Sequence, residues 1–270
     1  MPSPHPLGDY LRARRELLHP DEVGLPVTSG VRRVPGLRRS EIALLAGIST
    51  EYYVKLEQGQ ERHPTEQVLN ALARALQLDS TARSYLHGLA HLPERPVVSV
   101  PTSKVERTRW LIDSWPMTAA MILDARNDIL ATNALMTVLI PGYRVGRNSV
   151  EVLLLDPEVR ELYVEWEGLT MRSVGLLRAR IGPNPGDGRS KEIIAQLTHA
   201  SSRFRELWNR HDITGMTEGT HPITHPTMGA LTLHFAHLPL IGDEDYSIFL
   251  YYGEPGTPTE RALADLVPGR

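Results

Sequence analysis

The segment at residues 37–60, LRRSEIALLAGISTEYYVKLEQGQ, constrains the fold of this chain more than any other. Gly47 stands where a first helix would end, because glycine tolerates the positive φ that such a position favours. Ser49 follows as a natural N-cap of a second helix. Apolar residues on both sides of the turn are spaced so that the two helices can share one small core: Ile42, Ala43, Leu45, Ile48, Tyr53 and Leu56. This order of helix, glycine turn and capped helix predicts a helix-turn-helix unit.

Composition limits what the rest of the chain can be. Its 270 residues are enough for two modest domains, and an apolar fraction of 41% can build real cores. The absence of cysteine excludes disulfides and thiolate metal sites. No apolar run approaches the roughly 18 residues of a membrane span, and the N-terminus lacks the apolar core of a signal peptide. We therefore expect a cytoplasmic protein.

The charge balance places the basic signal in one short segment. A formal net charge of −3 is not that of a general nucleic-acid coat. Four arginines, Arg32, Arg33, Arg38 and Arg39, nevertheless crowd the start of the helix-turn-helix segment. A small basic footprint on a balanced surface is typical of a sequence-specific DNA-binding domain.

The first 92 residues predict a complete all-α domain of five helices. A helix at 7–18 precedes a long loop at 19–36, and the helix-turn-helix pair follows. Two further helices are expected at 65–76, capped by Thr65, and from Asp79 to about residue 90. Residues 93–103 contain three prolines and no helical pattern, so they are interpreted as a linker.

Residues 104–256 predict an α+β domain with a mainly antiparallel sheet, and residues 257–270 a C-terminal tail. Helices are expected at 104–115 and 133–139, over much of 151–181, and at 191–208. Strands are expected at 117–124, 128–132, 213–224, 230–238 and 246–252, with a hairpin turn at 226–229. Since helices interrupt the run of strands, we expect the sheet to be covered by helices on one face.

Several blocks resemble one family of regulators. The helix-turn-helix is similar to the xenobiotic-response-element (Cro/repressor-like) family, and RRVPGLRRSEIALLAGIS, YYVKLEQGQERHPTEQVLNALARAL, LDPEVRELYVEW, FRELWNRHDI, THPTMGALTL and YYGEPGTPTERAL resemble its MmyB-like, actinobacterial members. The resemblance covers nearly the whole chain. It implies a DNA-binding domain followed by a PAS-like domain for a small, apolar, fatty-acid-like ligand. One departure is Thr132 before Asn133, where members often carry an aromatic residue, and this could alter the pocket wall.

Polar side chains near the start of the second helix of the pair are candidates for reading base edges. Thr50 could contact a thymine methyl group, Glu51 a cytosine amino group, and Lys55 a guanine or a phosphate. Arg38 and Arg39 are placed to bind phosphates at a helix N-terminus. The simpler alternative is a helical hairpin with solvated polar residues. The full set of DNA-binding candidates is Arg38, Arg39, Ser49, Thr50, Glu51, Tyr52, Lys55, Gln58 and Arg62.

Large, adaptable apolar side chains in the second domain are candidates for a ligand pocket. The alternative for each of them is ordinary core packing. These candidates are Met117, Met121, Met136, Trp166 and Trp208.

No catalytic motif stands out, so we expect neither an enzyme nor a bound cofactor. Several histidines fall in the last third, but none forms a convincing metal pair, and the Trp208–His211–Asp212 block is interpreted as a structural corner.

Three hypotheses remain. The first is a homodimeric regulator that binds a double-stranded DNA operator and responds to a small apolar ligand. It would not associate with a membrane. The second is a DNA-binding protein whose C-terminal domain is a protein-interaction module. The third is a sensor that binds haem through a late histidine.

Overall fold

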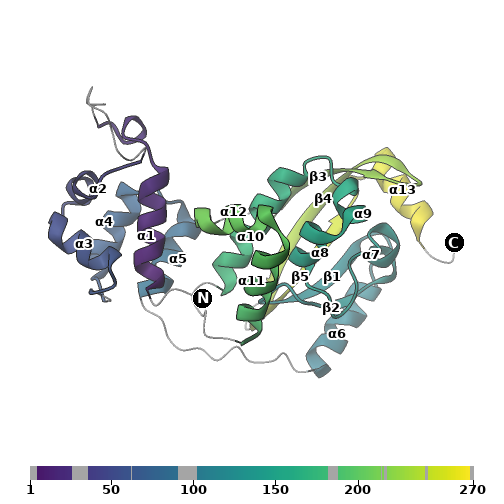
Figure 1. Cartoon of the computed structure of the whole chain (residues 1–270). Helices are drawn as coiled ribbons and strands as arrows, with labels where there is room; N and C mark the ends of the chain where they lie inside the picture. The colour runs from purple at the N-terminus through teal and green to yellow at the C-terminus, as the bar shows by residue number, and fades with distance from the viewer. Residues whose placement is uncertain are drawn as a thin grey trace.

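The computed structural model describes residues 5–25, 36–61, 63–90, 102–181, 188–213, 215, 218–240 and 243–267. It contains an N-terminal helical domain and a C-terminal α+β domain that lie against each other (Figure 1). The expected linker falls largely outside these residues, and so do Arg32, Arg33 and Arg62.

The N-terminal domain has the five helices predicted from the sequence. They are α1 (Pro6–Leu17), α2 (Arg39–Ala46), α3 (Thr50–Glu57), α4 (Glu66–Ala75) and α5 (Ser80–Ala90), with a 3-10 turn at Asp21–Val23. The turn between α2 and α3 is as expected: Gly47 has a φ of 66°, and the Ser49 hydroxyl accepts a hydrogen bond from Tyr52 N at 3.1 Å. Thr65 caps α4 in the same manner.

One apolar core holds these helices together. Ala43 is buried where α2 approaches α3, and Leu45 and Ile48 pack on the core from its edge. Fully buried side chains come from all five helices: Leu11, Ile42, Tyr53, Leu56, Leu69, Leu72 and Leu86 lie within this cluster. At roughly 1.5–3 kcal/mol for each large apolar side chain buried, this cluster is the main stabilising feature of the domain.

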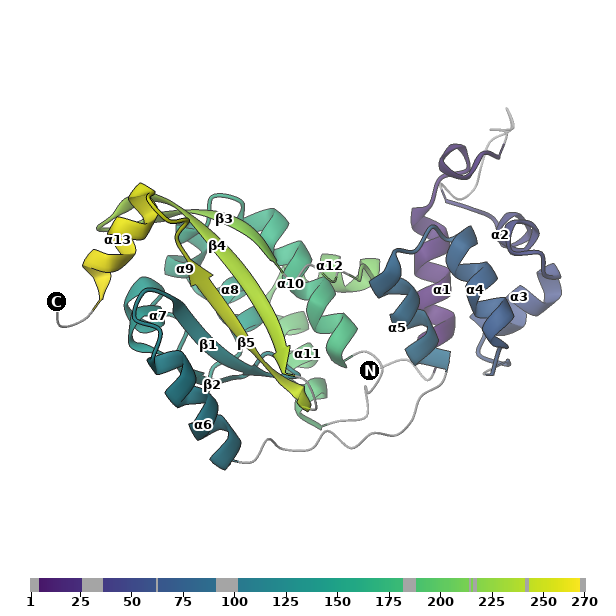
Figure 2. The same ribbon diagram turned by 180° about the vertical axis from the view of Figure 1, so that it is seen from behind.

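The second domain is built on a five-stranded antiparallel sheet in the order β2-β1-β5-β4-β3. Its strands are β1 (Ala119–Asp124), β2 (Ile129–Thr132), β3 (Glu218–His225), β4 (Gly229–Leu240) and β5 (Asp243–Tyr252). The last strand, β5, pairs with β1 on one side and with β4 on the other, so it joins the two halves of the sheet (Figure 2). The expected hairpin connects β3 to β4.

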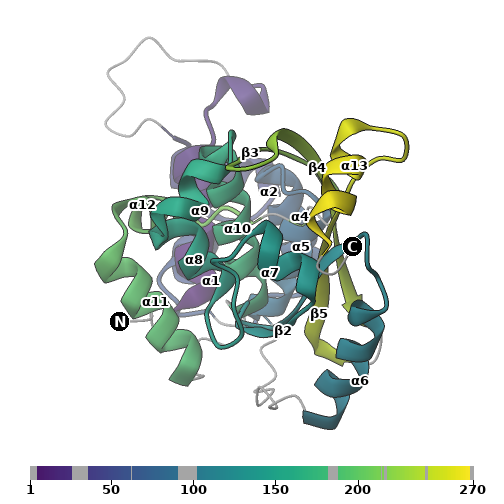
Figure 3. The ribbon, with the colours of Figure 1, turned by 90° about the vertical axis from the view of Figure 1, so that its right-hand side faces the viewer.

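Helices lie on both faces of this sheet, so the expectation of a single covered face is wrong. Alternate residues of β1 point to opposite sides: Met121 and Leu123 join a core with the middle helices, whereas Ala120 and Ile122 pack against Ile112 of α6 (Thr102–Asp113). Figure 3 shows α6 on the other side of the sheet from α8 and α10. The helices between β2 and β3 are α7 (Ala134–Leu139), α8 (Ser149–Leu155), α9 (Pro157–Leu162), α10 (Trp166–Ile181), α11 (Gly188–Ala200) and α12 (Ser202–Arg210).

Two segments differ from the sequence-based expectation. The helix expected at 191–208 is divided at Ser201, whose hydroxyl accepts a hydrogen bond from Phe204 N and so begins α12. Residues expected to form a tail contain a further helix, α13 (Pro258–Leu266). Leu263 and Leu266 of α13 are buried in the main core of the second domain. We therefore propose that this domain extends to Leu266.

Within the part of the chain that the structure describes, no helix is long and apolar enough to cross a membrane.

Candidate nucleic-acid interface and ligand crevice

The exposed face of α3 carries the three side chains expected to read bases. Thr50, Glu51 and Lys55 are all exposed. Lys55 Nζ lies 2.9 Å from Glu51 Oε1, one helical turn away, and this contact lowers the pKa of Glu51. Because the pair lies at the surface, Glu51 can exchange this contact for a base edge, and Lys55 for a base edge or a phosphate, at little free-energy cost.

The side chains of three other predicted DNA-binding residues, Ser49, Tyr52 and Gln58, make contacts within the helical domain. The Ser49 hydroxyl is engaged in capping α3. Tyr52 is half-buried against the helical core, and burial raises the pKa of its hydroxyl. Gln58 ends α3 and accepts a hydrogen bond from Gln60 Nε2 at 3.0 Å.

A buried carboxylate that the sequence analysis missed holds α1, α2 and α3 together. Glu57 Oε1 accepts from Arg15 Nε at 2.6 Å, and Oε2 accepts from Arg39 Nε at 2.7 Å. Arg15 also donates to the Leu37 carbonyl at 2.7 Å, and the side chain of Glu57 is only 1% exposed. Burial alone would raise the pKa of Glu57, but the hydrogen bonds from both arginines and the charge of Arg15 lower it. The possible signal was an acidic residue directly after the core residue Leu56.

The two predicted phosphate-binding arginines therefore differ. Arg38 is the N-cap of α2 and is exposed, and its backbone N donates to Glu41 Oε2 at 2.7 Å. Arg39 is 46% exposed, but its Nε is held by Glu57. The side chain of Arg38 is thus the more available of the two for a phosphate, whereas Arg39 is engaged with Glu57.

In the fold, α2 and α3 lie at the end of the molecule farthest from the sheet, whereas α1 and α5 face the second domain (Figures 1 and 2). The second domain leaves the candidate reading face of α3 open to a DNA duplex.

A narrow crevice lies in the second domain between α10 and the face of the sheet. Two adjoining cavities of about 70 and 50 Å³ share Leu169, Ser173 and Leu176 from α10 and His237 and Phe249 from the sheet. Pockets for drug-sized ligands typically measure about 300–1,000 Å³. A ligand with an acyl chain would therefore need this crevice to widen. Two larger hollows, of about 720 and 560 Å³, are open depressions beside Trp166 and beneath α6.

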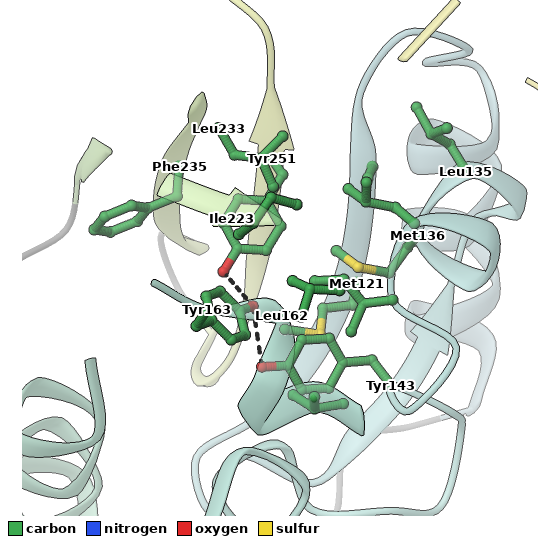
Figure 4. Close-up of a cluster of buried hydrophobic side chains, with 14 of the residues drawn as sticks. Met121, Leu135, Met136, Tyr143, Leu162, Tyr163, Ile223, Leu233, Phe235 and Tyr251 are labelled. Carbon is green, nitrogen blue, oxygen red and sulfur yellow. Dashed lines mark hydrogen bonds between the residues drawn. The ribbon is translucent and has the colours of Figure 1, made fainter. Parts of the chain in front are cut away.

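A chain of hydrogen-bonded rings runs through the core to this crevice (Figure 4). The hydroxyls of Tyr143 and Tyr163 are 3.4 Å apart, and those of Tyr163 and Tyr251 are 2.8 Å apart. The Tyr251 hydroxyl lies 2.9 Å from His221 Nδ1. Burial raises the pKa of each of the three phenols well above its ordinary value, so all three are neutral.

The chain ends at a buried nitrogen without a partner. Within the described residues, His221 Nε2 and Arg172 Nε are buried and make no hydrogen bond. Both residues line the smaller cavity. Burial, with a smaller contribution from the Arg172 charge, lowers the pKa of His221 to about 4, so its ring is neutral at pH 7. An unpaired buried polar group costs about 1–3 kcal/mol, which a ligand could recover by pairing with it.

The predicted ligand-binding set is spread over several places. Met121 lines the crevice, whereas Met136 of α7 is fully buried in the core. Met117 is half-buried just before β1. Trp166 begins α10 and donates from its indole to the Leu153 carbonyl at 2.8 Å. Trp208 lies on α12, stacked on Phe204 and beneath Arg178.

The late histidines occupy separate surroundings. His237 Nε2 is 2.7 Å from Ser247 Oγ, and His211 Nδ1 is 3.3 Å from an Arg178 nitrogen, so His211 lies in the structural corner predicted for it. No group of three or more potential metal ligands occurs among the residues described.

Three of the crevice residues missed by the sequence analysis, His221, His237 and Tyr251, lie on strands. Their common signal is weak: each occupies an inward position of an alternating strand, where polar rings are unusual.

Comparisons with known proteins agree with this division of the chain. The model of the helix-turn-helix domain family matches residues 6–86. The model described as the MmyB-like transcription regulator ligand binding domain matches residues 105–266. No curated protein that was compared with the chain gives a match.

Proposed function

Since the chain belongs to the family of MmyB-like transcription regulators, we propose that it binds a specific DNA operator as a homodimer and that a small ligand in the crevice alters this binding. The observation that carries the DNA-binding part is the open face of α3, with Thr50, Glu51 and Lys55 exposed beyond a capped turn. Two such helices would meet half-sites about 34 Å apart on a near-palindromic operator.

Selection of bound DNA from a random pool by the purified protein tests this part. We expect a near-palindromic site with half-sites about 10 base pairs apart and a steep loss of affinity with salt. Light scattering of the complex should give two chains per site. The selection is run with and without dodecanoate, a fatty acid that serves as a probe for the ligand. Failure to enrich any site under either condition would contradict the proposal.

Two variants separate base reading from phosphate binding. Lys55→Ala should lower affinity for the selected site and relax its sequence preference by about 1–3 kcal/mol at one position. Arg38→Gln should weaken binding to all sequences equally and reduce the salt slope by about one. Lys191→Ala, exposed on α11, is the matched control. Equal loss on every sequence for Lys55→Ala would show that Lys55 binds a phosphate.

The direction of hydrogen-bond donation along the tyrosine chain indicates which kind of head group a ligand would present to His221. Among the described residues, the Tyr143 hydroxyl bonds only to Tyr163, so its hydrogen has one acceptor. If Tyr143 donates to Tyr163, then Tyr163 donates to Tyr251 and Tyr251 donates to His221 Nδ1. His221 then carries its hydrogen on Nε2, facing the cavity. A carboxylate or carbonyl oxygen would accept that hydrogen, and Arg172 would favour the carboxylate.

We therefore propose an apolar ligand with an acceptor head group, with its chain along Leu169, Leu176 and Phe249. Calorimetric titration with dodecanoate and with dodecylammonium tests this. Dodecanoate should bind and raise the melting temperature, and dodecylammonium should bind at least ten-fold more weakly. His221→Phe should weaken dodecanoate binding about ten-fold, whereas His199→Gln, at an exposed position of α11, should not. Equal binding of the two amphiphiles would contradict the head-group assignment.

A protein-interaction module is the second candidate function for this domain. Trp110 of α6 is 70% exposed and Leu111 is 46% exposed, which favours a protein contact on that side of the sheet. Absence of any ligand-induced shift in melting temperature, together with loss of a protein complex in Trp110→Ser, would support this alternative.

A further inference from the structure

The two domains meet at a built contact, which we call the docking corner. On the ligand-domain side it comprises Arg178 of α10, Trp208 of α12, and His211, Asp212, Ile213 and Gly215 of the segment that follows α12. On the other side it comprises Tyr10, Arg14, Thr81 and Tyr85 of α1 and α5. Here the two domains contact each other through α1 with α12 and through α5 with α10.

Ionic and steric contacts cross the corner. Arg14 Nη1 donates to Asp212 Oδ1 at 2.7 Å, and both side chains are about one quarter exposed. Asp212 is held in turn by Arg210 Nε at 2.8 Å. Ile213 packs against the core of the helical domain, and a Cβ at Gly215 would overlap the side chain of Thr81. The fit therefore includes shape as well as charge.

Arg178 is the buried centre of the corner. Its guanidinium stacks 3.9 Å from the centre of the Trp208 ring, bonds to the Trp208 carbonyl, and lies 3.3 Å from His211 Nδ1. Across the domain boundary, the Tyr85 hydroxyl interacts electrostatically with this guanidinium and partly offsets the lowering of its pKa by burial. Tyr85 packs edge-on against Tyr10, with ring centres 5.1 Å apart. Arg178 is only 6% exposed. The removal of one of its partners would therefore leave a buried charge uncompensated.

The same helix forms one wall of the ligand crevice. Leu169, Arg172, Ser173 and Leu176 face the cavity. At about 100° per residue, Arg178 lies on the opposite side of α10 from Leu169. A helix is a rigid element, so a ligand that widens the crevice and displaces α10 also displaces Arg178.

From this arrangement we infer that the docking corner positions the helix-turn-helix domain for operator binding, and that ligand entry loosens it through α10. Arg178, Arg14 and Tyr85 are positioning residues in this scheme, since they touch neither DNA nor ligand. The responsive part rests on the function proposed above, whereas the positioning part does not. In the docked form a dimer would present its two α3 helices at a fixed spacing, and loosening would lower operator affinity.

The absence of cysteine in the sequence allows a direct test. Cysteines introduced as Gln67→Cys on α4 and Gln196→Cys on α11, both exposed positions, can carry spin labels. Labelled full-length protein diluted with unlabelled copies should give one narrow distance distribution. The double substitution Arg14→Gln and Tyr85→Phe should broaden it, because it removes the Arg14–Asp212 ion pair and the Tyr85 hydroxyl near Arg178 and leaves Arg178 in place. Arg12→Gln is the matched control, since Arg12 pairs within α1 with Glu16.

The same proteins are then titrated with operator DNA. We expect the double variant to bind the full operator several-fold more weakly than Arg12→Gln, with unchanged binding to a single half-site. Dodecanoate should broaden the wild-type distance distribution and lower operator affinity. In the double variant, operator affinity with and without dodecanoate should be nearly equal.

Identical distance distributions and operator affinities in the double variant and its control would overturn the positioning role. Dodecanoate that binds by calorimetry but leaves wild-type distances and operator affinity unchanged would overturn the responsive role. If dodecanoate does not bind at all, the ligand assignment fails, and the ligand-free comparison still decides the positioning role.

Discussion

At the scale of single residues, the N-terminal domain depends most on one carboxylate. Glu57 joins Arg15 and Arg39, and its side chain is 1% exposed. Glu57→Gln removes the buried carboxylate that pairs with Arg15 and Arg39, and we expect it to destabilise the domain by about 3–5 kcal/mol in urea unfolding. Glu51→Gln, exposed on α3, should change stability by less than about 0.5 kcal/mol. Equal stability of the two variants would contradict the role given to Glu57.

Acidification provides a second test of the same ion pairs. The folded-state pKa of Glu57 lies below 4.5, so the stability it contributes is present above pH 4.5 and is lost as the pH falls through the folded value. The loss should be smaller in Glu57→Gln, which has no group to titrate at this position.

His221 gives the ligand domain a different dependence on pH. Its folded-state pKa is lowered from 6.5 to about 4, so between these values the unfolded chain binds a proton that the folded protein does not. Stability should therefore decrease as the pH falls from 6.5 to 4, by up to roughly 3 kcal/mol from this group. Urea midpoints across this range should fall less steeply in His221→Gln, whereas His199→Gln should follow the wild type.

Residues show where the sequence was sufficient and where it was not. Gly47 and Ser49 were predictable because a helix end and a helix start each impose a local backbone requirement. Glu57 and His221 were not, since their partners lie far away in sequence: Arg15 is 42 positions from Glu57, and Tyr251 is 30 positions from His221. A lone polar residue in an apolar pattern marks an unusual site but does not name its partner.

At the scale of elements, the tight turn between α2 and α3 fixes the orientation of the reading helix. Gly47 has a φ of 66°, and a Cβ there would meet open space, so only backbone strain opposes a side chain. Gly47→Ala should lower stability by about 1–2 kcal/mol. Ser40→Ala, exposed on α2, is the control. A melting temperature equal to that of the control would mean that the turn relaxes without strain.

The elements themselves were largely predictable, and their packing was not. Strands and helices followed the periodicity of apolar residues, so the α+β class was correct. The position of α6 on the opposite face of the sheet was missed, because a short helix with one buried face fits either side. The burial of α13 was missed for a similar reason: Leu263 and Leu266 form too brief a pattern to distinguish a packed helix from a tail.

At the scale of the whole molecule, ligand and operator should influence each other equally. If dodecanoate lowers operator affinity ten-fold, thermodynamic linkage requires operator DNA to lower dodecanoate affinity ten-fold. Calorimetric titration of dodecanoate into the free protein and into the operator complex measures this. The variant with Arg14→Gln and Tyr85→Phe should show little effect in either direction, whereas Arg12→Gln should retain both.

The order of strands in the sheet has a consequence for how the protein is made. The strand β5 lies between β1 and β4, yet it follows both of them in the sequence. During synthesis the sheet must therefore wait until β5 has left the ribosome, whereas the five N-terminal helices are complete by Ala90 and make local contacts that form quickly. Each new copy would thus possess a folded helix-turn-helix domain before it possesses the domain that regulates it.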